Sequence, residues 1–265
     1  MMAVSINDSM HEISITPITK KIVVRYDGGH VSLPADLLSG IEVYWEELLR
    51  SGRPYTRGET FTVTGRNDTD ERIEISVTRT DFAHNLYCRR FPVPDGYAAR
   101  VIHTAALVET SDGKVVFGRM SGHTSHSGRY QLCGGGLDNN DLHGDILDLD
   151  HNTKKELREE FGIDVDDTNR VGSFFPAYFK EGGQRGRMSV IYRVALKETA
   201  GEFLNRYDVF DDGLRKSGEE PEFDEIVVFN RNSKELLSFL ARENLRFEEY
   251  MRPLFEYIAS DQTLK

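Results

Sequence analysis

Residues 147–164, LDLDHNTKKELREEFGID, contain three glutamates within five positions and, near their end, a glycine followed by an apolar residue. On a helix that advances 100° per residue, Glu156, Glu159 and Glu160 stand at i, i+3 and i+4, so their carboxylates share one face. Like charges at these spacings repel by roughly 0.2–0.5 kcal/mol per pair. A hard divalent cation, which prefers oxygen ligands, would remove that repulsion. The spacing therefore indicates a candidate metal site.

The same helix has an apolar side. Leu157 and Phe161, at i and i+4, are expected to pack on the core, and Gly162 suits the left-handed conformation that ends many helices. The alternative is an exposed charged face in which Lys155 and Arg158 partner the glutamates. We favour a site because the segment follows three consecutive glycines, which let the backbone approach a ligand closely.

The composition is that of a globular protein. Of its 265 residues, 38% are hydrophobic and 29% charged, and no stretch approaches the roughly 20 apolar residues of a membrane-spanning helix. The first ten residues lack the features of a secretory signal, so we expect a cytoplasmic protein without a membrane partner. A net charge of −11 disfavours nucleic acid as a partner, since phosphate binding needs basic surface. Cys88 and Cys133 form no CxxC pair, and we expect two reduced thiols.

Towards the N-terminus, the pattern predicts a small α/β unit over residues 1–95. Strands are expected at residues 20–29, 61–65 and 72–82, with turns at residues 27–29 and 66–68. Apolar residues at helical spacing predict a helix over residues 35–52. The stretch FPVPDGY, with two prolines and a glycine, marks the end of this unit.

The remaining residues, 96–265, are expected to form a second α/β unit. Its strands are expected at residues 99–110, 114–120, 130–135, 174–179, 188–196 and 225–230. Besides the glutamate segment, residues 233–244 and 247–260 have amphipathic helical patterns, the second interrupted by Pro253.

This order of elements and motifs resembles the Nudix hydrolases, whose box reads Gly-x5-Glu-x7-Arg-Glu-apolar-x-Glu-Glu-x-Gly-apolar. The second half of the box matches residues 155–163, with Lys155 in place of arginine. Residues 130–136, YQLCGGG, are similar to the family's aromatic-x-x-Pro-Gly-Gly, with Cys133 in place of proline. The resemblance implies a Nudix hydrolase domain over residues 96–265, an α/β/α sandwich around a mixed sheet, preceded by the small N-terminal α/β unit.

The resemblance also implies roles for the box residues. Glu159 and Glu160 would be the principal ligands of Mg²⁺ or Mn²⁺, and Glu156 a further ligand. Lys155 would orient one of these carboxylates, as the family's arginine does, but without a bidentate fork. Zinc is the weaker interpretation for the loop histidines His123, His126, His143 and His151, which lack cysteine partners and helical His-x3-His spacing.

The first half of the box departs from the family pattern. The nearest counterpart to the family's Gly-Glu is Gly144-Asp145, yet the segment between Gly136 and Lys155 is longer than the box allows. We therefore expect an insertion within residues 137–152, and we do not place Asp145 among the ligands.

Further candidates lie outside the glutamate segment. Arg185 and Arg187 stand among glycines, a composition suited to binding phosphate, although a flexible soluble loop is an equal alternative. The candidate substrate-binding residues are Arg119, Arg129, Gly135, Gly136, Arg185 and Arg187. From the acidic stretch EEPEFDE, Glu222 or Glu225 could serve as catalytic base or extra ligand, and Glu225 is our candidate. An acidic surface loop is the alternative.

The resemblance implies a Mg²⁺-dependent pyrophosphohydrolase that cleaves the diphosphate of a nucleoside diphosphate linked to another moiety. The N-terminal stretches VYWEELL and TRTDFAHN and the long box resemble the Nudix enzymes acting on UDP-glucose and UDP-galactose. ADP-ribose and dinucleoside polyphosphates are alternative substrates, and a non-catalytic Nudix-like nucleotide sensor is an alternative function. The N-terminal unit would serve substrate specificity or dimerisation.

Overall fold

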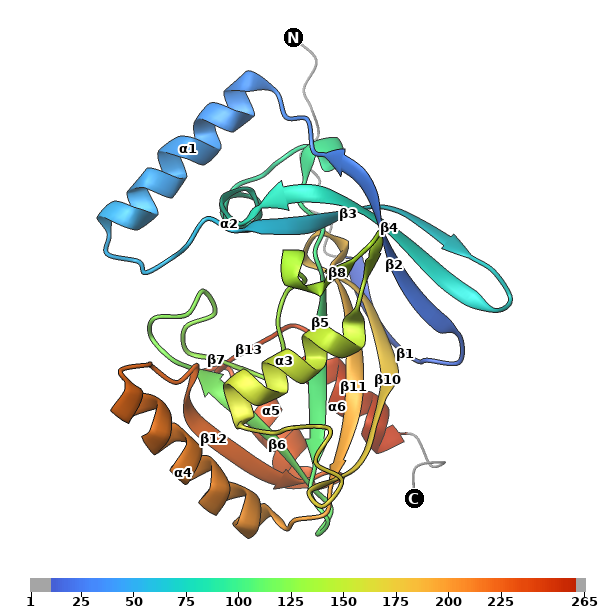
Figure 1. Cartoon of the computed structure of the whole chain (residues 1–265), viewed down its shortest axis with the longest axis vertical. Helices are drawn as coiled ribbons and strands as arrows, with labels where there is room; N and C mark the ends of the chain where they lie inside the picture. The colour runs from blue at the N-terminus through green and yellow to red at the C-terminus, as the bar shows by residue number, and fades with distance from the viewer. Residues whose placement is uncertain (1–10, 261–265) are drawn as a thin grey trace.

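The computed structural model describes residues 11–260, and the first ten residues, which carry the expectation about a secretory signal, lie outside this range. The chain is a mixed α/β protein with two mixed sheets (Figure 1). Between residues 11 and 260, no helix has the length and apolar character needed to cross a membrane.

The larger sheet has the strand order β1-β10-β11-β5-β6-β7-β13, and β12 pairs with β6 off this path. Its strands are β1 (His11–Pro17), β5 (Ile102–Glu109), β6 (Lys114–Met120), β7 (Arg129–Gln131), β10 (Val171–Gly183), β11 (Met188–Leu196), β12 (Phe223–Asn230) and β13 (Arg246–Phe247). The pairs β5–β11 and β7–β13 are parallel, and the others are antiparallel.

Helices cover both faces of this sheet, because successive side chains of a strand point to opposite faces. On one face, Ala105 and Leu107 of β5 belong to a core cluster with α5 (Lys234–Leu240) and α6 (Met251–Ser260). On the other face, Ala106 and Val108 pack with α3 (Leu149–Phe161) and α4 (Ala200–Ser217). The glutamate segment therefore lies on a helix that is docked against the sheet.

The smaller sheet has the order β3-β4-β2-β9-β8. Its strands are β2 (Lys21–His30), β3 (Glu59–Asp68), β4 (Arg72–Asp81), β8 (Leu142–His143) and β9 (Ile146–Leu147). Two helices from the same part of the chain accompany it, α1 (Ala35–Arg50) and α2 (Phe82–Arg90). The hairpin β8–β9 comes from the expected insertion, and it joins the sheet through the antiparallel pairing of β9 with β2.

The two sheets are connected by strand pairing and by a common core. Strand β1 precedes the smaller sheet in the chain but pairs with β10 of the larger one. A core cluster combines Val24 and Ile75 of the smaller sheet with Phe179 and Val190 of the larger sheet. The inserted hairpin contributes Leu147 to the same cluster, so it is packed into the core on one side.

The two turns expected in the N-terminal unit are wrong, because both segments lie within strands. Residues 66–68 are the end of β3, and the chain reverses after them, where the Thr69 hydroxyl accepts the backbone N–H of Arg72. Residues 27–29 remain within β2, where Gly28 has a φ of 81° and the register against β4 is irregular. Polar, glycine-containing stretches can bulge within a strand as well as reverse it.

The expected interruption of the last helix is also wrong. Helix α6 begins at Met251, so Pro253 lies in its first turn, where a missing backbone donor costs nothing. Helix α4 was not expected, although its start carries a capping box in which Thr199 and Glu202 bond each other's backbone N–H groups. It ends at Gly218, whose φ is 85°.

Candidate functional site

Helix α3 is fixed at both ends and along one side. The Asp148 side chain caps its N-terminus by accepting the backbone N–H of His151, and Gly162, with a φ of 61°, ends it in the left-handed conformation. Leu157 and Phe161 are fully buried. The expected apolar anchor and the expected helix end are therefore confirmed, and the opposite side of the helix is free to present its glutamates.

A cavity of about 380 Å³ lies between α3 and the glycine-rich turn. Glu156 and Glu160 of α3 line it together with Glu222, which precedes β12, and residues 134–136. We call Glu156, Glu160 and Glu222 the carboxylate end of the cavity. The part of the chain before residue 96 also contributes to its wall, through Tyr55, Thr60, Phe61, Phe82, Asn85 and Arg89.

Glu160 is the most enclosed of these carboxylates, with 3% of its surface exposed. Its Oε2 accepts the backbone N–H of Gly134 at 2.9 Å, and its carboxylate also accepts a hydrogen bond from the Cys133 thiol. Burial raises the pKa of Glu160 well above its usual range, and the charges of Glu222 and Glu156 raise it further. Without a bound cation, these surroundings therefore favour the protonated form of this carboxyl group.

Glu156 has a similar but less enclosed environment. Burial raises its pKa to about 8; the charge of Lys155 opposes this shift, and those of Glu222 and Glu159 add to it. Glu159 itself is exposed and lies outside the cavity lining. The structure thus brings Glu156 and Glu160 together with Glu222, whereas it leaves Glu159 in solvent on the same helix.

The glycine turn fits closely against these carboxylates. A Cβ atom at Gly135 would lie 2.5 Å from Oε1 of Glu156, and one at Gly134 would collide with the Thr104 carbonyl oxygen. By contrast, a Cβ at Gly136 would meet nothing within 4 Å. The first two glycines are therefore needed for the approach of this turn to α3 and β5.

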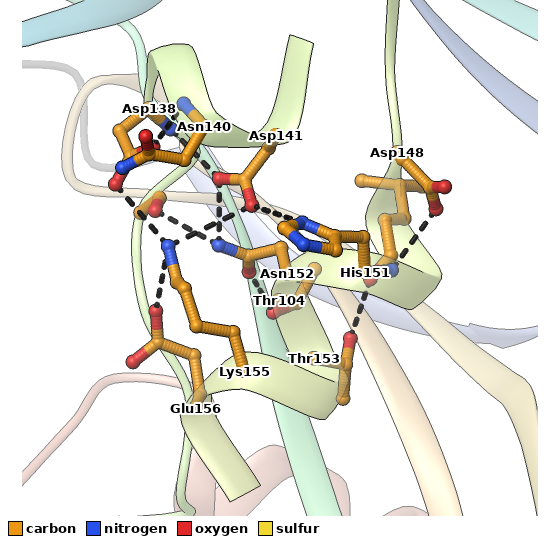
Figure 2. A network of polar contacts seen from close by, with 12 residues as sticks. Thr104, Asp138, Asn140, Asp141, Asp148, His151, Asn152, Thr153, Lys155 and Glu156 are labelled. Atoms are coloured by element: carbon orange, nitrogen blue, oxygen red, sulfur yellow. Dashed lines mark hydrogen bonds and ion pairs between the residues drawn. The ribbon is translucent and has the colours of Figure 1, made fainter. Parts of the chain in front are cut away.

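Lys155 lies between Glu156 and two aspartates of the inserted segment (Figure 2). Its Nζ is 3.2 Å from Asp138 Oδ2, 3.6 Å from Asp141 Oδ1 and 3.6 Å from Glu156 Oε1. A lysine in this position can hold the Glu156 carboxylate in place, which is the role that the resemblance implies for it.

Asp141 was not singled out from the sequence, although it is fully buried beside the site. It accepts hydrogen bonds from the Asn152 amide at 3.0 Å and from the backbone N–H of Asp138 at 2.9 Å, and its Oδ1 lies 3.2 Å from His151 Nδ1 (Figure 2). The Asn152 amide also donates to the Gly136 carbonyl at 3.1 Å. Asp141 therefore links the start of α3 to the glycine turn.

The position of Asp141 relative to Gly135 and Lys155 is a signal in the sequence that could have identified it. Five residues separate it from Gly135, as in the first half of the Nudix box, and thirteen separate it from Lys155, six more than the box allows. The six extra residues, 142–147, are the hairpin β8–β9. Asp145 lies in the turn of that hairpin, where it forms an exposed ion pair with Arg25.

Of the four candidate arginines, one lines the cavity and three do not. Arg187 lines the cavity, whereas Arg185 does not, because its guanidinium donates to the carbonyls of Cys88, Phe91 and Val93. Arg119 and Arg129 also lie outside the lining. Their partners are Asp224 and Glu225 for Arg119, and Glu248 for Arg129.

Of the two candidate glutamates in the acidic stretch, Glu222 lines the cavity and Glu225 does not. The Glu225 carboxylate accepts the Tyr130 hydroxyl at 2.8 Å and lies 3.2 Å from Nε of Arg119. These partners hold Glu225 on the β12–β6 pair, apart from the carboxylates of α3.

The carboxylate end suits a hard cation by its donor chemistry. Across residues 11–260, no three histidine, cysteine, aspartate or glutamate side chains are arranged as a finished metal-ligand cluster. The two helix carboxylates nevertheless have raised pKa values, because they are buried next to each other and to Glu222. A divalent cation would relieve this crowding of negative charge, and carboxylate oxygens are the ligands that Mg²⁺ prefers.

No family model matches the chain, and no curated protein matches it. Among solved structures, it is similar to DR0079 from Deinococcus radiodurans, at 15% identity over 60% of this chain and 82% of that one, with a TM-score of 0.41. A NUDIX-family hydrolase from Clostridium perfringens is 12% identical over 63% of this chain and 99% of that one, with a TM-score of 0.37. The NUDIX domain of Shewanella oneidensis NrtR, solved with ADP ribose, is 13% identical over 68% and 97%, with a TM-score of 0.36.

Proposed function

We propose that this protein is a divalent-metal-dependent pyrophosphohydrolase of the Nudix type, which cleaves the diphosphate of a nucleoside diphosphate linked to another moiety. The observation that carries the proposal is the meeting of Glu156, Glu160 and Glu222 at one cavity beside Gly135. These carboxylates come from two separate segments, and on the docked helix Glu160 is buried and Glu156 partly buried, which suits a cation site better than a solvated helix face.

Mg²⁺ or Mn²⁺ would be held by Glu156 and Glu160, with the exposed Glu159 as a candidate ligand on the same helix. When bound, such a cation neutralises a diphosphate and lowers the pKa of a bound water. The protein's own groups position these carboxylates: the Gly134 N–H holds Glu160, and Lys155 holds Glu156.

We propose Glu222 as the group that accepts a proton from the attacking water. It lines the cavity and comes from a different segment than the two carboxylates of α3. Glu225, the earlier candidate, is occupied by Tyr130 and Arg119. A base must lie within hydrogen-bond reach of its water, so a place in the cavity favours Glu222.

For the substrate, we propose a nucleotide sugar such as UDP-glucose, with ADP-ribose and dinucleoside polyphosphates as alternatives. We further propose that residues 1–95 form the N-terminal unit and supply specificity, and that residues 96–265 form the hydrolase domain. The support is that Tyr55, Phe82 and Asn85 reach the same cavity as the carboxylates. Aromatic rings and an amide are side chains suited to binding a nucleobase or a sugar.

The test is a panel of nucleotide sugars, ADP-ribose, dinucleoside polyphosphates and nucleoside triphosphates, assayed with Mg²⁺ and with chelator. We expect turnover of at least one diphosphate-linked member, and we expect chelator to abolish it. Nucleotide binding without chelator-sensitive turnover of any member would contradict the enzyme and favour the non-catalytic sensor.

A further inference from the structure

Two arginines from distant segments line the cavity that holds the carboxylate end. Arg89 comes from the last turn of α2, and Arg187 precedes β11. The cavity therefore has basic side chains in its lining besides its carboxylates, and we call Arg89 and Arg187 its arginine end.

The two guanidinium groups of the arginine end have no direct ion-pair partner. Among residues 11–260, neither Arg89 nor Arg187 forms an ion pair within 4.0 Å. Glu248 lines the same cavity, and its carboxylate lies 3.3 Å from Arg129 and 3.2 Å from Nε2 of His126. Burial, reinforced by the charge of Arg187, lowers the pKa of Arg89 to about 10. Two like charges thus line one partly desolvated cavity.

Other arginines in this region have partners, which makes these two distinctive. Arg119 and Arg129 pair with carboxylates, and Arg185 binds backbone carbonyls. An unpaired guanidinium in a cavity costs free energy that a bound anion recovers. Each guanidinium also presents several N–H donors in a planar fork that matches phosphate oxygens.

Arg185 ties the loop that carries Arg187 to the end of the helix that carries Arg89. Its Nε and Nη2 donate to the carbonyls of Cys88 and Phe91 at 2.7 Å each, at the C-terminal end of α2. The Gln184 amide donates to the carbonyl of Arg89 itself at 3.4 Å. The loop that carries Arg187 is thus bonded to the helix end that carries Arg89, so the arginine end exists before any ligand binds.

We propose that Arg89 and Arg187 together bind phosphate oxygens of the substrate, so that the N-terminal segment supplies a substrate-binding residue of the active site. This inference rests on the proposed function for its statement that the cavity holds substrate. Arg185 is a positioning residue in this account, since it acts through the end of α2. The arginine end takes a phosphate group whether or not a metal is present at the carboxylate end.

The test is isothermal titration calorimetry, in which pyrophosphate is added to the full chain in the presence of chelator and the dissociation constant is measured. We expect the wild-type protein to bind, and we expect Arg89→Met and Arg187→Met each to weaken binding by roughly tenfold or more, because each removes a charge-assisted contact. Arg90→Met is the matched control: Arg90 is the exposed neighbour of Arg89 on the same helix and lies outside the cavity lining, so binding should be unchanged.

Two further readouts keep the result interpretable. Arg89→Met should unfold at no lower temperature than the wild type, since it removes an unpaired charge and keeps the aliphatic stem. Arg89→Lys should bind with intermediate affinity, because the charge remains without the fork. Equal affinity in Arg89→Met and wild type, or no pyrophosphate binding by the wild type, would overturn the inference. Suppose that Arg89→Met loses pyrophosphate binding but no member of the substrate panel is turned over. The phosphate site at Arg89 and Arg187 would then stand, and only the proposed hydrolase activity would be contradicted.

Discussion

Glu159 and Glu160 are neighbours in sequence with opposite surroundings. Glu160 is buried and accepts the Gly134 N–H, whereas Glu159 is exposed. A helix turns 100° between successive residues, so one step along α3 separates the cavity from solvent. The spacing of the three glutamates predicted a shared face, and it could not predict which members of that face the glycine turn would cover.

The raised pKa of Glu156 predicts a pH dependence of stability for the metal-free protein. Its pKa is about 8 when folded and about 4.5 as a free side chain, so between these values the folded state retains a proton that the unfolded state has lost. Stability is therefore greatest below about pH 4.5 for this group, and it falls as pH rises towards 8.

The measurement is thermal unfolding in chelator from pH 5 to pH 8. We expect the wild-type melting temperature to fall with pH relative to that of Glu156→Gln, which has no proton to lose. Added Mg²⁺ should reduce the difference between the two proteins at pH 8. Parallel pH profiles for the two proteins in chelator would show that Glu156 is not held neutral.

The glycine turn offers a second test at the residue scale. Gly135→Ala would place a Cβ atom 2.5 Å from the Glu156 carboxylate, and it should lower turnover by roughly tenfold or more, because a shifted carboxylate misplaces the reacting groups. Gly136→Ala is the control, since its Cβ would meet nothing within 4 Å. Comparable turnover of the two variants would mean that the close approach of Gly135 to Glu156 has no role in the reaction.

At the scale of elements, the hairpin β8–β9 connects the smaller sheet to the start of α3. The hairpin pairs with β2, while Asp141 before it and Asp148 after it bond to residues of the helix. Figure 2 shows the Asp141 carboxylate pointing towards the side chains of Lys155, Asn152 and His151. The inserted hairpin thus leaves Asp141 bonded to the start of α3.

Asp141→Asn should destabilise the protein by on the order of 1–3 kcal/mol, because a fully buried charge that faces Lys155 is lost. It should also lower turnover, since Lys155 would be held less firmly against Glu156. Asp145→Asn, in the exposed turn of the hairpin, is the control and should change neither quantity measurably. Chemical denaturation together with initial rates gives both readouts, and equal stability of the two variants would contradict the role of Asp141.

Local patterns predicted the elements that depend on local physics. The apolar spacing of Leu157 and Phe161 and the stop at Gly162 were enough to place α3. The hairpin β8–β9 could not be predicted in this way, because its two-residue strands exist only through pairing with β2, far away in sequence. Helix α4 was missed although its capping box at Thr199 and Glu202 is a local signal.

At the scale of the whole molecule, the N-terminal unit and the rest of the chain share strands, core and cavity. Strand β1 pairs with β10, β9 pairs with β2, and one cluster of buried side chains spans both sheets. The helices α1 and α2 lie at one end of the molecule, with α3 and the larger sheet below them in the view of Figure 1. Composition marked a boundary near residue 95, but it carried no information about these long-range contacts.

Some residues of the candidate site could be named from local sequence patterns, and others only from the fold. The helix carboxylates Glu156 and Glu160 and the turn at Gly135 were named from the sequence and do line the cavity. Arg89 was not named, since it lies four residues beyond the stretch TRTDFAHN, and only the fold of α2 against the loop before β11 brings it to the wall of the cavity.

The central claim is that the carboxylate end binds a divalent cation, and the most direct measurement is Mn²⁺ binding followed by electron paramagnetic resonance. We expect the wild-type protein to bind Mn²⁺ and Glu160→Gln to bind it roughly tenfold or more weakly, because a ligand is lost. Glu219→Gln, an exposed acid outside the cavity lining, should bind as the wild type does. Wild-type affinity in Glu160→Gln, in a protein that remains folded, would contradict the account.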